Sequence, residues 1–228
     1  MNNIAEIVNA FLLVYAALFP VINPVGGAPI FLRLTNRTPK ARLPSLARGV
    51  AINSFVLLLC SLFIGSHVLV FFGITLPVLR IAGGLVVAAL GWRLLHQGDD
   101  LEGRDQPAPR EKEVDAFYPL TMPLTVGPGS ISVAITLGSQ RPSSAVDLAQ
   151  LAALGGGAAA GLAAIAATIY VCYRFAGNIV TVLGERGTNV MMRLSAFLLF
   201  CIGIQIIWGG LRTLLPQLPS YVALALPL

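Results

Sequence analysis

The stretch Asn23-Pro24-Val25-Gly26-Gly27-Ala28-Pro29 breaks an apolar run that begins near Ile4 and ends at Leu32. A second stretch of the same kind, Thr125-Val126-Gly127-Pro128-Gly129-Ser130, breaks the apolar run 117–138. Proline removes a backbone donor and glycine leaves the backbone loose, so neither suits the middle of a helix. In hydrocarbon, a freed backbone group is tolerated only where protein or a water-filled cavity satisfies it. The matched pair therefore predicts a site, and the alternative is two kinks that only shape helix packing.

The composition is typical of a polytopic membrane protein. Of the 228 residues, 56% are hydrophobic and 11% are charged, whereas soluble domains carry about 25% charged residues. A spanning helix needs roughly 20 apolar residues. That criterion predicts an all-α membrane protein of six spans, at 6–34, 49–72, 76–95, 117–139, 149–173 and 190–214.

Basic residues are concentrated in three of the predicted connections, and cytoplasmic loops carry such an excess. These connections hold Arg33, Arg37, Lys40, Arg42, Arg48, Arg93, Arg104, Arg110, Lys112, Arg174, Arg186 and Arg193. The opposite side holds Arg80, Arg141 and Arg212. The asymmetry predicts that the three basic connections lie in the cytoplasm and that both termini lie on the outer side of the cytoplasmic membrane.

The two breaks also indicate an internal repeat. Pro24 aligns with Pro128 at a step of 104 residues, and Arg80-Ile81-Ala82-Gly83 aligns with Arg193-Leu194-Ser195-Ala196. We expect one transmembrane domain over 1–228, with three-helix repeats at 1–95 and 117–215 and a polar cytoplasmic linker at 96–116. Because each repeat has three spans, the two must be inverted, as in many secondary transporters.

The predicted substrate site is built from the two breaks. Ser130 is a good N-cap for a half-helix, whose free N–H groups and positive dipole end would accept a carboxylate. Pro29 suits the first turn of the other half-helix, and carbonyls near Asn23 and Val126 would take an ammonium group or a Na⁺ ion. The predicted site residues are Asn23, Pro24, Gly26, Gly27, Val126, Gly127, Gly129, Ser130 and Ser132.

Four further polar residues are secondary candidates for the site. Asn53 and Gln205 are amides that need a partner inside a membrane, although interhelical hydrogen bonding is the more ordinary role. Arg80 and Arg193 open their spans at the membrane rim, where snorkelling to lipid headgroups is the default. The spans contain no deep carboxylate, no nucleophile–base pair and no metal-ligand cluster. An enzyme is therefore not expected.

The segment from Leu18 to Leu32 resembles the first signature of the MarC family of six-span integral membrane proteins. Pro123-Leu124-Thr125-Val126-Gly127-Pro128-Gly129-Ser130-Ile131 resembles the second, and Arg80-Ile81-Ala82-Gly83-Gly84 a third. The resemblance implies a multi-pass protein of a prokaryotic inner membrane and transport of small neutral amino acids such as alanine and glycine. The resemblance does not assign a functional role to any residue of this chain.

We therefore expect a secondary transporter of small zwitterions, with its site at the midplane between the broken helices. A passive channel and a non-transporting scaffold are the alternatives. The expected partners are a small-molecule substrate and the lipid bilayer, without nucleic acid. No cofactor is predicted. The coupling ion, Na⁺ or H⁺, and the oligomeric state are left open.

Overall fold

The structure, a computed structural model, describes residues 2–96, 114–139 and 148–217, and within these ranges it is helical. The predicted linker at 96–116 falls largely outside them. The described helices follow in chain order: α1 (Asn2–Ile22), α2 (Pro24–Leu34), η1 (Lys40–Arg42), α3 (Leu43–Phe71), α4 (Leu76–His96), η3 (Leu120–Thr125), α5 (Pro128–Ser139), α6 (Leu148–Arg174), α7 (Ala176–Leu214) and η4 (Leu215–Gln217).

Five helical segments in the described ranges are long and apolar enough to cross a membrane. They are Ile4–Ile22, Lys40–Phe71, Leu76–His96, Gln150–Arg174 and Arg186–Leu214. The predicted span 117–139 is not one continuous helix. Its helix α5 has 12 residues, which is about 18 Å and roughly half of a hydrocarbon core.

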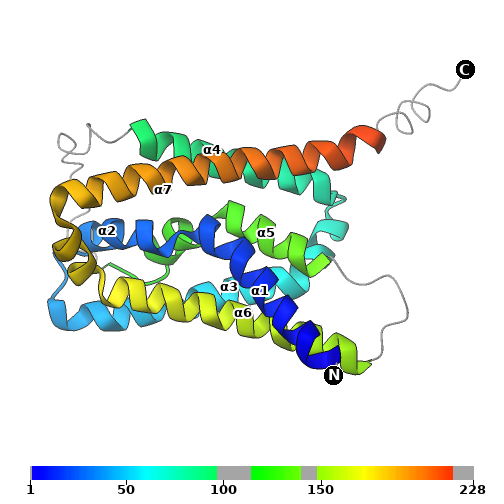
Figure 1. Cartoon of the computed structure of the whole chain (residues 1–228), viewed down its shortest axis with the longest axis horizontal. Coiled ribbons are helices and arrows are strands. Elements are labelled where there is room, and N and C mark those ends of the chain that lie inside the picture. Colours follow the sequence, from blue (N-terminus) through cyan, green and yellow to red (C-terminus); the bar gives the residue numbers. More distant parts are fainter. Residues whose placement is uncertain (1, 97–113, 140–147, 218–228) are drawn as a thin grey trace, which may run out of the picture.

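The half-helices α2 and α5 lie between two groups of longer helices (Figure 1). α4 and α7 pack along each other on one side, and α1, α3 and α6 form the other group. α2 contacts α6 and α7, whereas α5 contacts α3 and α4. The half-helices therefore join the two groups.

Close pairing of α4 with α7 depends on glycine. A Cβ atom on Gly84 would lie 2.8 Å from the Gly203 carbonyl oxygen, and one on Gly91 would meet the backbone of Phe200. Small residues let membrane helices approach closely, so that van der Waals packing holds them together. α7 is longer than the predicted span 190–214, and Gly184, with φ 65°, bends it near its start.

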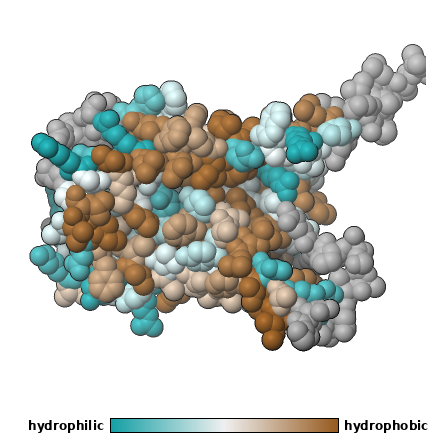
Figure 2. All heavy atoms as spheres, viewed as in Figure 1, coloured by the Kyte–Doolittle hydropathy of each residue, from teal (hydrophilic) through white to brown (hydrophobic). Residues whose placement is uncertain are grey.

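The connections collect at two ends of the molecule (Figure 1). One end holds the α2–α3 connection, the end of α4 and the α6–α7 connection, and we call it the basic end. These connections and the adjoining parts of α2, α3, α4, α6 and α7 contain Arg33, Arg37, Lys40, Arg42, Arg48, Arg93, Arg174, Arg186 and Arg193. The opposite end holds the start of α1, the α3–α4 turn and the end of α7. Hydrophobic residues cover much of the face between the two ends (Figure 2), as a membrane requires.

Candidate functional site

The first break lies at Asn23, between α1 and α2. Asn23 adopts the left-handed conformation (φ 48°, ψ 58°), and its side-chain oxygen accepts a hydrogen bond of 3.2 Å from the Gly26 N–H. Asparagine is one of the few residues other than glycine that tolerate this conformation. Asn23 is therefore the N-cap of α2, and Pro24 occupies the first helical position, which proline favours. The prediction that Pro29 lies in the first turn of this half-helix was wrong, because α2 begins at Pro24 and Pro29 lies inside it.

The second break extends from η3 to the start of α5. Pro123 offers no N–H, and the chain around it forms wide turns, in which the Val126 N–H donates to the Thr121 carbonyl at 2.8 Å. Val126 is extended, and α5 begins at Pro128. Ser130 is therefore not the N-cap that we predicted. It lies in the first turn, where its hydroxyl donates to the Gly127 carbonyl at 2.9 Å.

Both half-helices begin near the middle of the molecule and run to opposite ends. α2 extends from its break to the basic end, and α5 extends to the opposite end (Figure 1). Each helix has its N-terminus at its break, and the N-terminus carries the positive end of the helix dipole. The breaks thus bring two partial positive charges toward the centre of the molecule.

Tyr173 of α6 connects the two breaks. Its hydroxyl lies 2.9 Å from the hydroxyl of Thr125 in η3, and its ring stacks on Phe31 of α2 with centroids 4.7 Å apart. A Cβ atom on Gly27 would lie 2.7 Å from the same tyrosine hydroxyl. Tyr173 is 2% exposed and Phe31 is fully buried. The absent side chain at Gly27 thus makes room for a polar contact between α6 and the second break.

Two predicted site residues on α5 pack against α4. A Cβ atom on Gly129 would clash with the Val87 side chain, and one on Gly83 would clash with Ser132. The Ser132 hydroxyl donates to the Leu79 carbonyl at 3.1 Å. These contacts give Gly129 and Ser132 a structural role in the packing of α5 on α4.

The other predicted residues of the breaks differ in accessibility. Pro24, Gly26, Val126 and Ser130 are buried, whereas Asn23, Gly27 and Gly127 are partly exposed. A Cβ atom on Gly127 would have one neighbour within 4 Å, the Pro123 carbonyl oxygen at 3.4 Å. Gly127 is thus the predicted residue of the second break with the most room beside it.

The four secondary candidates are distributed over the long helices. Asn53 is half-buried in α3, and Gln205 lies on the exposed face of α7. Arg80 is half-buried in α4, with its Nε 3.5 Å from the Thr136 hydroxyl of α5. Arg193 is exposed in the half of α7 nearer the basic end. These four positions thus lie on three different long helices, α3, α4 and α7.

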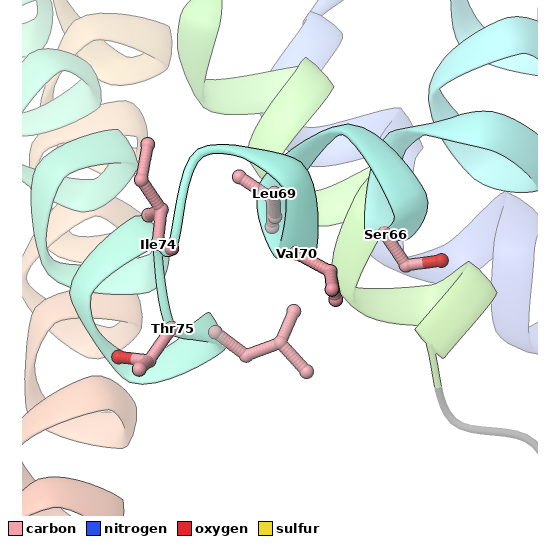
Figure 3. A pocket seen from close by; sticks show the side chains of 7 residues that line it. Ser66, Leu69, Val70, Ile74 and Thr75 are labelled. Atoms are coloured by element: carbon pink, nitrogen blue, oxygen red, sulfur yellow. The ribbon is translucent and has the colours of Figure 1, made fainter.

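The two cavities described in the structure lie along α3, away from the breaks. One, of about 430 Å³, lies at the α3–α4 turn and is lined by Ser66, Leu69, Val70, Gly73, Ile74, Thr75 and Leu76 (Figure 3). The other, of about 250 Å³, is lined by Cys60, Ser61, Ile64, Gly65, Val68, Leu69 and Ile135. The described residues contain no group of three His, Cys, Asp or Glu residues that could hold a metal ion.

Sequence reasoning missed the contribution of Tyr173 and the role of Thr125, which entered only as part of a motif. A signal existed for the tyrosine, because a buried phenolic hydroxyl usually finds a hydrogen-bond partner. The sequence did not identify that partner, because Thr125 lies 48 residues away along the chain.

The apolar helices and the two interrupted segments define a multi-span helical membrane protein. The chain belongs to the MarC family of integral membrane proteins, because the family model matches residues 8–215.

The chain is 30% identical over 211 residues to the UPF0056 membrane protein YvbG of Bacillus subtilis, covering 91% of this chain and 96% of that protein. It is 30% identical over 206 residues to the UPF0056 inner membrane protein MarC of Salmonella typhimurium, covering 85% and 90% respectively. A UPF0056 membrane protein of Buchnera aphidicola is 28% identical over 204 residues, with 90% and 92% covered. No solved structure matches the chain.

Proposed function

We propose that this protein is a secondary transporter of small neutral amino acids, with its substrate site between the two broken helices. The observation that carries the proposal is the placement of two helix N-termini, those of α2 and α5, at breaks near the middle of an apolar protein. Such termini bind anionic groups through free N–H groups and the helix dipole. The choice of alanine-like or glycine-like substrates rests on the family resemblance.

The proposed architecture is six membrane passages in two inverted repeats, in which η3 and α5 together make the fourth passage. Two observations support it. The contacts of α2 with α6 and α7 have counterparts in the contacts of α5 with α3 and α4. In addition, buried positions 50, 54, 58, 62, 65 and 69 recur as buried positions 157, 161, 165, 169, 172 and 176, a constant step of 107 residues. Inverted repeats of this kind place a substrate site near the midplane.

The function is tested by counterflow of labelled alanine and glycine in liposomes that contain the purified protein. A carrier should show saturable exchange, because a single binding site faces the two sides of the membrane in turn and carries substrate in both directions. Folded protein that exchanges neither amino acid would remove the proposed substrates. Flux that neither saturates nor exchanges would identify a channel.

Gly127→Val tests the position of the substrate site. Valine suits the extended conformation favoured before a proline, and the space beside Gly127 accepts a side chain. Valine would cover the start of α5, so we expect exchange to fall roughly tenfold, equivalent to about 1.4 kcal/mol, within the range of a partly buried dipole interaction.

Gly156→Val is the matched control for Gly127→Val, because a Cβ atom at Gly156 has no neighbour within 4 Å. Gly156→Val should leave the melting temperature near that of the wild type. Gly127→Val should lower it modestly, because Gly127 precedes α5 and accepts the Ile131 N–H, and valine is a poorer N-cap than glycine. Unchanged exchange in a well-folded Gly127→Val protein would place the site elsewhere.

The proposed orientation puts the basic end in the cytoplasm and both termini outside, because cytoplasmic loops carry excess Lys and Arg. Cysteine at Thr75, an exposed residue in the α3–α4 turn, should react with an impermeant thiol reagent added to intact cells. Cysteine at Arg37, in the α2–α3 connection, should react only after the membrane is opened. The reverse pattern would invert the orientation.

A further inference from the structure

Tyr173 fills the space between the two breaks on the side of the basic end. It stands at the end of α6, stacks on Phe31 and reaches Thr125, so that it contacts α2 and η3 together. Phe31 is fully buried and Thr125 is 2% exposed. The three side chains are therefore packed together where α6, α2 and η3 meet.

The hydrogen bonds of this cluster have a defined direction. The Thr125 hydroxyl donates its hydrogen to the Leu120 carbonyl at 2.7 Å. A hydroxyl has one hydrogen to donate, so Thr125 accepts and Tyr173 donates in their 2.9 Å contact. The tyrosine ring is held on one face by Phe31, while its hydroxyl is fixed by Thr125.

In the part of the chain that the structure describes, the position equivalent to Tyr173 near the opposite end is occupied by a smaller residue. At the step of 107 residues that relates the buried positions of α3 and α6, Tyr173 corresponds to Ser66 and Cys172 to Gly65. Ser66 lines the cavity of about 430 Å³ at the α3–α4 turn, and Gly65 lines the cavity of about 250 Å³. The position equivalent to Tyr173 therefore holds a small side chain that lines a cavity along α3, whereas Tyr173 itself is packed against α2 and η3.

We propose that Tyr173 is the gate residue of the basic end, and that its hydrogen bond to Thr125 and its stacking on Phe31 hold that end closed. This inference rests on the proposed alternating-access function. Opening toward the basic end requires α6 to separate from α2 or η3, and either movement breaks a contact of Tyr173. The substrate site opens to this side only after the tyrosine has moved.

Tyr173→Phe is the direct test, because it removes the hydroxyl and keeps the ring on Phe31. The reporter is Cys172, a buried native cysteine next to the gate, in a background in which the exposed cysteines Cys60 and Cys201 are changed to alanine. The purified protein is placed in lipid nanodiscs, which leave both ends accessible, and its reaction with a water-soluble maleimide is followed. We expect Cys172 to react about fivefold faster, the change that corresponds to loss of one ordinary hydrogen bond.

Tyr15→Phe is the matched control. The Tyr15 hydroxyl lies 3.1 Å from that of Thr168, so it also joins two helices, α1 and α6, through a pair of hydroxyls. Its removal should leave the Cys172 labelling rate unchanged, because neither residue belongs to the gate. Thr125→Val should raise the rate as Tyr173→Phe does, and the double variant should add nothing further, because both remove the same bond.

Equal labelling in Tyr173→Phe and the wild type would overturn the gate assignment, as would an equal rise in Tyr15→Phe. The measurement needs no substrate, so its result is independent of whether alanine or glycine is transported. Absence of counterflow together with faster labelling would remove the proposed substrates and leave the gate. Normal counterflow with unchanged labelling would leave the transporter and remove the gate.

Discussion

Valine at position 203 will destabilise the protein more than any other change considered for the long helices. Gly203 faces α4 so closely that an added Cβ atom would clash with the Ala88 backbone nitrogen and lie 2.7 Å from the Ala88 Cα. Backbone atoms cannot move aside as the end of a side chain can, so α4 and α7 must separate. Overpacking of this kind costs about 3 kcal/mol, and we expect a marked fall in melting temperature in detergent.

Gly209→Val is the control for this prediction. It makes the same substitution in the same helix, where a Cβ atom has no neighbour within 4 Å. Both variants make the same change in helix propensity, so the difference between their melting temperatures isolates the contact with α4. Equal melting temperatures would show that close packing of α4 on α7 does not contribute to stability.

Substitution of Asn23 will have the second large effect, and its size will depend on the new residue. Valine will lose the cap on Gly26 and must adopt the left-handed conformation seen at φ 48°. The cap contributes about 1 kcal/mol, and the left-handed conformation costs about 1–2 kcal/mol for a residue with a Cβ atom. We expect Asn23→Val to lower the free energy of unfolding by about 2–3 kcal/mol.

Asn23→Gly separates the two contributions, because glycine adopts the left-handed conformation freely and is a tolerable N-cap. It should lower the free energy of unfolding by only a few tenths of a kcal/mol. Thermal unfolding of both variants in the same detergent measures the difference. If glycine were as damaging as valine, the side chain of Asn23 would matter for something other than backbone conformation.

The positions of both breaks could be predicted from the sequence, because proline and glycine change the conformation of the backbone locally. The starts of the half-helices were placed too late, at Pro29 and Ser130, although Pro24 and Pro128 were available for the first helical position. The bend at Gly184 was missed. With φ 65° and ψ 177°, this glycine separates the turns that begin at Ala176 from the apolar segment Arg186–Leu214, which lies close to the predicted span 190–214.

The candidate site was less predictable than the breaks. Gly129 and Ser132 were assigned to substrate on local chemistry, and the structure packs them on α4. The face that a short helix turns to its neighbour depends on residues far away in the chain. For the same reason, the contact of Tyr173 with Thr125 and Phe31 could not be derived from the spacing of any motif.

Each half-helix packs against long helices of the other repeat, and this arrangement has a consequence for synthesis of the chain. Phe31 stacks on Tyr173, which lies far along the chain. At ordinary rates of elongation, Tyr173 therefore leaves the ribosome roughly 7 to 30 s after Phe31. During that interval α2 lacks α6 and α7, which are its contacts in the finished protein. A nascent chain released after α1, α3 and α4 would leave α2 without these contacts inside the bilayer, and we expect membrane proteases to degrade it.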